Sequence, residues 1–109
     1  MTHNQTLMIN AQAGGNTSSS VDVSTAQVVF IDAYVVQVGA ATGYGTITPQ
    51  WSNDAGTTWI SGSSYQFALA AGTNPQQFAV PASPNLYRVV FAPSTGGTSC
   101  TCTAWLTWY

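Results

Sequence analysis

Residues that could perform acid–base or nucleophilic chemistry are scarce in this chain of 109 residues. The only side-chain carboxylates belong to Asp22, Asp32 and Asp54, and the only histidine is His3. Glycoside hydrolysis needs two carboxylates at a fixed separation, and a nucleophilic triad needs a histidine held beside its nucleophile. Asp54 lies in a tight turn, no pattern surrounds the other two aspartates, and His3 lies in the terminal segment. We therefore predict no catalytic residues and no enzyme activity.

The cysteines Cys100 and Cys102 are the remaining candidates for site chemistry. Alternate positions in a strand place both thiols on one face, a spacing that is awkward for a disulfide between them. A metal site would need further ligands, and His3 lies near the other end of the chain. We predict no metal and no other cofactor. We interpret the thiols as small buried hydrophobic groups, with a bridge between subunits as the alternative.

Charge is also scarce, because charged residues make up 4% of the chain and the formal net charge is −2. Soluble proteins usually contain about 25% charged residues. A single cationic side chain, Arg88, cannot make the several contacts that nucleic acids or anionic membranes require. No apolar run reaches the ~20 residues of a membrane span, and the first residues lack the regions of a signal peptide. We expect no nucleic-acid partner, no membrane partner and no Sec export.

The low charge favours two classes of protein. One is a secreted or lectin-like domain with a neutral polar surface, and the other is a subunit whose surface is mostly covered in an assembly.

The elements that must position these residues follow a period of two residues, the periodicity of β-strands. Segments rich in Val, Ile, Thr and aromatic residues recur about every 8–12 residues between Gly, Pro, Ser and Asn. We predict an all-β fold, an antiparallel β-sandwich or jelly roll of about 8–9 strands. The expected strands cover residues 7–11, 26–38, 46–51, 57–61, 65–69, 76–80, 86–92 and 99–108, and residues 21–23 are a further candidate.

The chain divides into two parts by composition. Residues 1–20 are interpreted as an N-terminal arm, or as a first short strand followed by a loop rich in Gly and Ser. Residues 21–109 are interpreted as the β-sandwich domain. Within the strand predicted at 46–51, Pro49 indicates an edge or a bulge.

The segment 26–38 is apolar on both of its predicted faces. A half-exposed strand alternates apolar and polar residues, so we expect this strand to be covered by the core on one side and by another subunit on the other. Asp32 and Arg88 each lie in a strand among apolar residues, where an unpaired charge is costly. They either pair with each other, within or between subunits, or both face solvent. Alternation in the last strand leaves Trp105 facing outward, as a third candidate for the interface.

One short motif is well defined, the sequence Ser-Asn-Asp-Ala-Gly-Thr-Thr-Trp at residues 52–59. Asp54 can accept hydrogen bonds from backbone N–H groups of its own turn, and Gly56 can adopt a positive φ. The motif resembles the Asp-box of sialidase-type repeats, which implies a self-stabilised β-hairpin. One copy in a chain of this length cannot make a propeller, so no sialidase chemistry is implied. The defining positions are Ser52, Asp54, Gly56, Thr58 and Trp59.

The wider sequence, about residues 26–109, resembles small β-sandwich virion proteins of tailed bacteriophages. The resemblance rests on the apolar strand at 26–38, the hairpin motif, the segment Leu-Tyr-Arg-Val-Val-Phe and the final segment Thr-Cys-Thr-Ala-Trp-Leu-Thr-Trp-Tyr. It implies a non-enzymatic virion protein that serves in capsid decoration (cement), as a head fibre or as a tail component. We favour a decoration protein that bridges capsid subunits. Such a protein is made in the host cytoplasm, is located in the virion and contacts the major capsid protein or another virion protein. We expect a homo-oligomer, with a trimer favoured.

Two alternative functions remain open. The first is a carbohydrate- or receptor-binding module of a phage fibre or tail, in which aromatic side chains stack on a glycan. The second is a tail-tube or tail-completion subunit.

Overall fold

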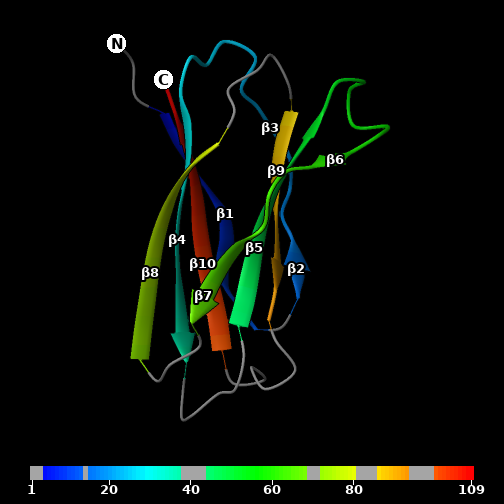
Figure 1. The fold of residues 1–109 in the computed structure, drawn as a ribbon. Helices are drawn as coiled ribbons and strands as arrows, with labels where there is room; N and C mark the ends of the chain where they lie inside the picture. Colours follow the sequence, from blue (N-terminus) through cyan, green and yellow to red (C-terminus); the bar gives the residue numbers. More distant parts are fainter. Residues whose placement is uncertain (1–3, 14, 38–43, 69–71, 81–85, 94–99) are drawn as a thin grey trace.

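The computed structural model describes residues 4–13, 15–37, 44–68, 72–80, 86–93 and 100–109. These residues form ten strands in two antiparallel sheets that pack face to face (Figure 1), which confirms the predicted β-sandwich. None of them lies in a helix that is long and apolar enough to cross a membrane. The four-stranded sheet has the order β1 (Asn4–Ala13), β10 (Cys100–Trp108), β4 (Val29–Gln37) and β8 (Gly72–Val80).

The six-stranded sheet is built around β9 (Leu86–Ala92) and β5 (Tyr44–Ser52), which pair with each other. Two short strands, β2 (Asn16–Thr17) and β3 (Val21–Asp22), pair with β9 on its other side. Likewise β6 (Ile60–Ser61) and β7 (Tyr65–Ala68) pair in succession with β5.

The strand pairs are nested along the chain. β1 pairs with β10, β2 and β3 pair with β9, β4 pairs with β8, and β5 pairs with β6 and β7. Successive pairs alternate between the two sheets, which is the arrangement of a jelly roll. The two ends of the chain therefore lie in neighbouring strands of one sheet (Figure 1).

Alternation along each strand places one set of apolar side chains between the sheets. In β4 the inward residues are Val29, Ile31, Ala33 and Val35, and none is more than 4% exposed. They belong to one core cluster with Ile47 of β5 and the inward side chains of β9. The prediction that the core covers one side of this strand is confirmed.

The final strand β10 shows the predicted alternation. Cys102 and Leu106 are fully buried on the inward side, whereas Trp105 is partly exposed on the outward side. Thr103 and Thr107 lie on the outward side with Trp105, and each is only 5% exposed. The side chain of Cys100 lies outside the described residues.

Of the two interpretations of the N-terminal segment, the structure has the first strand and not the arm. Residues 4–13 form β1, which pairs with β10 and buries Ile9 in the core. The segment after β1 crosses to the other sheet, where β2 and β3 both pair with β9. No break in the fold therefore falls at residue 20.

The prediction of an edge strand at Pro49 is wrong, because β5 is paired on both sides. The alternative of a bulge is confirmed, because residues 48–49 of β5 face the three residues 62–64 between β6 and β7. The Pro49 carbonyl accepts a 2.9 Å hydrogen bond from the N–H of Gly62, in the gap between β6 and β7. The nitrogen and carbonyl of one residue point to the same side of a strand, so the missing N–H of proline faces this gap. Pro49 is therefore tolerated because the ladder is interrupted there.

Candidate functional site

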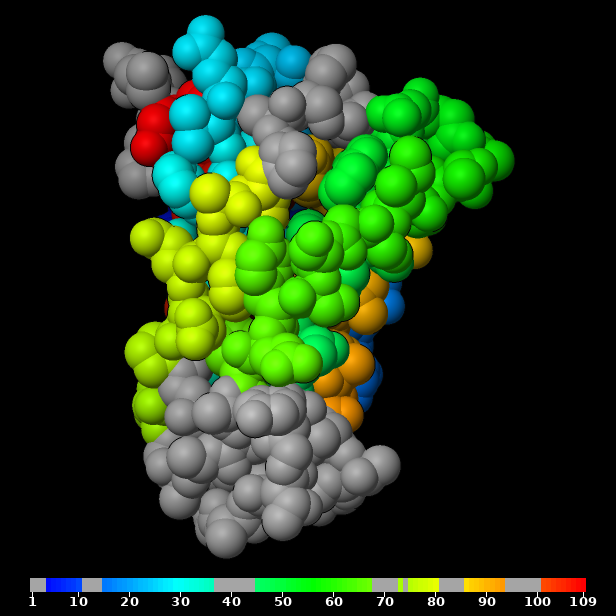
Figure 2. Space-filling view, viewed as in Figure 1, coloured from blue at the N-terminus to red at the C-terminus, as the bar shows by residue number. Residues whose placement is uncertain are grey.

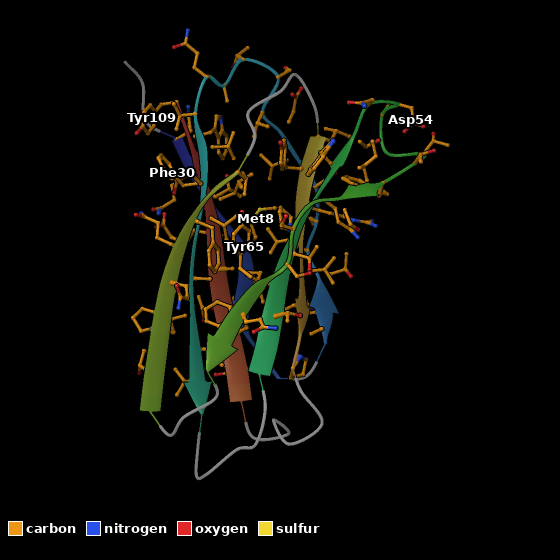
Figure 3. All side chains as sticks on the ribbon, viewed as in Figure 1. Met8, Phe30, Asp54, Tyr65 and Tyr109 are labelled. Atoms are coloured by element: carbon orange, nitrogen blue, oxygen red, sulfur yellow. The ribbon has the colours of Figure 1, made fainter. Side chains whose placement is uncertain are left out.

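The outward side of the four-stranded sheet carries partly exposed aromatic rings. Phe30 and Tyr34 project from β4, Trp105 projects from β10, and Tyr109 follows the end of β10. We call these four rings together with Asp32 the aromatic face. The described strands form only two layers, so no third layer of described residues covers this face. Figure 3 shows two of its rings, Phe30 and Tyr109, close together near one end of the sheet.

The rings form two pairs, one on each side of Asp32 along β4. The ring centroids of Tyr34 and Trp105 are 5.8 Å apart, and those of Phe30 and Tyr109 are 6.1 Å apart. Alternate residues of a strand are about 6.6 Å apart, so both pairs lie within reach of a group bound at Asp32. The sequence predicted Asp32 and Trp105 as interface residues, and the structure places them directly opposite each other in the sheet.

The Asp32 carboxylate is held by two neutral donors from the neighbouring strands. Gln77 Nε2 donates to Oδ1 at 2.6 Å, and Thr107 Oγ1 donates to Oδ2 at 3.0 Å. Gln5 Nε2 in turn donates to Thr107 Oγ1 at 3.4 Å. The resulting polar row crosses all four strands, and it fixes the direction of the carboxylate without neutralising its charge.

Two shallow hollows lie on the aromatic face, and Asp32 and Gln77 line both of them. The larger, of about 540 Å³, is also lined by Tyr34 and Trp105. The smaller, of about 320 Å³, is also lined by Phe30, Tyr109, Gln5 and Thr107. Each hollow thus combines a pair of aromatic rings with carboxylate and amide groups.

Arg88 lies on the opposite outer face of the molecule, on β9 of the six-stranded sheet. Its Nε donates to Gln50 Oε1 at 2.7 Å, and its guanidinium carbon is 4.1 Å from the centroid of a Trp59 ring. The hydrophobic core lies between this face and Asp32. The prediction that Asp32 and Arg88 pair within one chain is therefore wrong, because the two side chains point away from each other on different sheets.

The hairpin motif forms the turn between β5 and β6, which projects beyond the body of the sandwich (Figure 1; Asp54 is labelled in Figure 3). Ser52 Oγ donates to Asp54 Oδ1 at 2.8 Å and accepts the N–H of Gly56 at 2.8 Å. The same carboxylate oxygen accepts the N–H of Thr58 at 2.7 Å. Both Ala55 (φ 59°) and Gly56 (φ 93°) adopt the left-handed conformation.

Hydrogen bonding makes the Asp54 carboxylate a stronger acid. The N–H of Thr58 and the hydroxyl of Ser52 hold the pKa of Asp54 below its ordinary value of 3.8. Asp22 behaves similarly, because the N–H of Ser24 donates to its Oδ1 at 2.8 Å and lowers its pKa. Both aspartates therefore stabilise turns of their own segments.

The side of the sandwich next to β8 is closed by aromatic packing. Tyr65 stacks on Phe78 with 4.0 Å between ring centroids, and its hydroxyl donates to the Ala79 carbonyl at 3.3 Å. Figure 2 shows β7 and β8 in contact on this side. A groove of about 730 Å³ lies beside this contact. Pro49 and Trp51 of β5 line it from one sheet, and Ala79 and Val80 of β8 line it from the other.

The three aspartates lie in separate parts of the fold. Asp22, Asp32 and Asp54 lie on a short strand, on the aromatic face and in the projecting turn, respectively. Among the described residues, no group of three or more His, Cys, Asp or Glu side chains could hold a metal ion. Sequence reasoning missed the support that Gln77 and Thr107 give to Asp32, because that contact depends on the order of strands in the sheet.

Comparison with known proteins gives a fold and no family. The sequence matches no protein-family model and no curated protein. A chain from the Bacillus endospore appendages, described as a novel family of disulfide-linked pili, shares 16% identity at a TM-score of 0.51. That match covers 99% of this chain and 86% of the other, and it shows a shared β-sandwich fold.

Two further solved structures are similar at TM-scores of 0.48. A Family 16 carbohydrate-binding module is 13% identical, over 84% of this chain and 68% of its own. A chain from infectious bursal disease virus, Gx strain, is 16% identical, over 97% of this chain and 31% of its own. Likenesses of this degree carry no argument about function.

Proposed function

We propose that this chain is a non-enzymatic structural protein of a virion, and specifically a bacteriophage capsid decoration protein. The observation that supports the proposal is the aromatic face, an outer sheet surface with four partly exposed rings and no described layer over it. Leu7, opposite Trp105 on β1, extends this apolar surface and is 45% exposed. Exposed aromatic and aliphatic side chains gathered on one face are typical of protein–protein contacts.

The mechanism of such a protein is adhesion. Burial of the aromatic face against a neighbouring subunit or the major capsid protein removes apolar surface from water, which stabilises the shell. The low charge of the chain agrees with this role, because it allows copies to approach each other closely. The proposed assembly is a homo-oligomer, with a trimer as the favoured number.

The proposal is tested by quantitative mass spectrometry of purified virions from the phage that encodes this chain. A decoration protein is present in a copy number proportional to that of the major capsid protein. Absence from the virion, or a copy number matching tail components, would overturn the proposal.

A matched pair of variants tests which surface adheres. Leu7→Ser removes an apolar side chain beside the aromatic face, and Ile60→Ser removes one of similar exposure, 43%, at the projecting hairpin. We expect only Leu7→Ser to weaken attachment to undecorated capsids in a pelleting assay. Equal attachment of both variants would contradict the assignment of this face.

A second candidate function is glycan binding, and the two hollows favour it. Aromatic rings can stack on the C–H faces of sugar rings, while the Asp32 carboxylate and the Gln77 amide can bond sugar hydroxyls. A glycan array tests this candidate, with Trp105→Ala as the variant expected to lose binding. Absence of binding to every neutral oligosaccharide on the array would exclude it.

A further inference from the structure

The four charged side chains of this protein fall into two groups. Asp22 and Asp54 accept hydrogen bonds from backbone N–H groups within their own turns, so their charges serve the local fold. Asp32 and Arg88 cap no turn and lie within strands β4 and β9. They have opposite signs and lie on opposite outer faces, so an interaction between them requires two copies of the chain.

The surroundings of Asp32 suit a guanidinium group. A carboxylate can accept about four hydrogen bonds, and Asp32 accepts two from described residues. Those donors are neutral, so the negative charge remains to attract a cation. The ring pairs on either side of Asp32 offer π-faces, to which a guanidinium is attracted more strongly when water is excluded.

The Arg88 guanidinium is held in an orientation that suits binding to a carboxylate of another chain. Its Nε bonds to Gln50, and its guanidinium lies over the Trp59 ring, so the plane of the group is held. Arginine carries five N–H donors, and Nε supplies only one of them. The two terminal nitrogens can therefore form a bidentate pair with a carboxylate, the geometry in which arginine binds such groups best.

We propose that the aromatic face binds the Arg88 guanidinium of a second copy of this chain, so that copies associate head to tail through an Asp32–Arg88 ion pair. The inference rests on the proposed function, for which it names the partner of the aromatic face. A contact of two identical aromatic faces is disfavoured, because it brings two Asp32 carboxylates together. The head-to-tail contact is heterologous, so it closes into a ring or continues as an open stack according to the rotation between copies.

Two charge reversals test the contact. Asp32→Arg gives a chain with a positive charge on both outer faces. Arg88→Asp gives a chain with a negative charge on both outer faces. Neither variant can pair with itself head to tail. In an equal mixture, each variant offers the complementary charge to both faces of the other.

Sedimentation velocity over a range of concentrations provides the readout, with circular dichroism to verify that each variant is folded. We expect the wild-type chain to associate, and to associate less at high salt. Each variant alone should associate at least about 30-fold more weakly, the lower end of the range for losing a charge partner in a contact. The equal mixture should recover association.

Three outcomes would overturn the inference: a wild-type chain that stays monomeric, variants that associate as strongly as the wild type, or folded variants whose mixture recovers nothing. Where reversal disturbs the fold, the milder variants Asp32→Asn and Arg88→Gln replace it, and both must weaken association. Asp32→Ser and Gln76→Ser form a matched control, because Gln76 lines the same hollow without contacting the carboxylate oxygens.

The test separates this inference from the proposed function. If the mixture fails to associate while virions contain the chain at capsid copy number, the head-to-tail contact is wrong and the decoration role stands. If the copies associate as expected while virions lack the chain, the head-to-tail contact stands and the decoration role is wrong. A monomer that binds a neutral glycan through Trp105 would replace both with the glycan-binding candidate.

Discussion

Ser52 is the residue on which the projecting hairpin turn depends. It is only 2% exposed, and its hydroxyl both donates to Asp54 and accepts the N–H of Gly56. A side chain of two heavy atoms therefore joins both ends of the turn. The hydroxyl itself is buried, whereas the Asp54 carboxylate that it bonds is exposed.

Removing this hydroxyl should destabilise the whole domain. We expect Ser52→Ala to lower the free energy of unfolding by about 0.5–1.5 kcal/mol, since the hydrogen bonds to Asp54 and Gly56 are lost. The melting temperature should fall by roughly 4–8 °C per kcal/mol. Thermal unfolding followed by circular dichroism measures the effect. Ser63→Ala, at an exposed position, is the control and should unfold like the wild type.

The lowered pKa values of Asp54 and Asp22 make stability sensitive to acid. Each carboxyl has a pKa below 3.8 in the folded state and near that value in the unfolded state. The unfolded chain therefore takes up protons first as the pH falls, and it gains stability relative to the folded chain. Above about pH 5 this contribution is fully present and constant.

We accordingly expect the melting temperature to be flat near neutral pH and to fall below about pH 4. Asp54→Asn should reduce the steepness of that fall, because one of the shifted carboxyls is gone. Thermal unfolding at a series of pH values checks both statements. An acid slope that is identical in the variant would show that Asp54 does not contribute to it.

Among the elements, β4 shows what the sequence can and cannot reveal. Its period of two identified Val29 and Ile31 as members of one face, and the structure places both in the core. The apolar character of the other face was equally visible, with Phe30 and Tyr34 flanking Asp32. Which faces become inner and outer depends on how two sheets stack, and a single strand carries no such information.

The residues of the candidate site could be identified one strand at a time, but their arrangement could not be predicted. Asp32 and Trp105 were identified separately as interface candidates, but their adjacency follows from the pairing of β4 with β10. Gln77 reaches Asp32 because β8 is the other neighbour of β4. These strands are separated in the chain by long segments, so local pattern cannot predict their register. The mistaken idea of an intramolecular Asp32–Arg88 pair has this origin.

The gap between β6 and β7 depends on a residue without a side chain. A Cβ at Gly62 would lie 2.8 Å from Cζ3 of Trp51 and 3.2 Å from Cγ of Pro49, both closer than normal contact. Gly62 therefore lets the chain pass directly against the indole ring. The interruption divides the strand pairing of β5 at this point.

We expect Gly62→Ala to lower the free energy of unfolding by about 1–3 kcal/mol, the usual cost of overpacking. Gly15→Ala is a suitable control, since the nearest atom to its added Cβ would be 3.6 Å away, an ordinary contact. Urea denaturation should place Gly15→Ala within about 0.5 kcal/mol of the wild type. Equal midpoints for the two variants would contradict the packing explanation.

At the scale of the whole molecule, the nested strand pairs make the first strand essential to the last. β1 provides one edge of the four-stranded sheet, and it covers β10, whose other neighbour is β4. Ile9 of β1 is 1% exposed and belongs to the core. Loss of β1 would expose the backbone groups of β10 and open the core beside them.

Deletion of residues 1–13 therefore distinguishes an integral strand from an arm. We expect the shortened chain to lose its cooperative urea transition, because the loss of Ile9 alone costs about 2–5 kcal/mol of a total stability of about 5–15 kcal/mol. An unchanged transition midpoint would mean that the segment is a dispensable arm.

The two outer faces of the molecule differ in chemistry. One is aromatic around a single carboxylate. The other carries two hydrogen-bonded groups, Thr48 with Ser64, and Gln50 with Arg88 and Ser61. This contrast gives the sandwich a direction, so that stacking one face on the other is a defined contact.

The position of Arg88 has a further consequence for proteolysis. Trypsin cuts after lysine or arginine, and this chain contains one such residue. Its scissile bond to Val89 lies within β9, which is paired on one side with β5 and on the other with β2 and β3. A folded molecule cannot offer this bond in the extended, accessible form that a protease requires. Cleavage into residues 1–88 and 89–109 therefore requires unfolding, and each molecule cut reports one unfolding event.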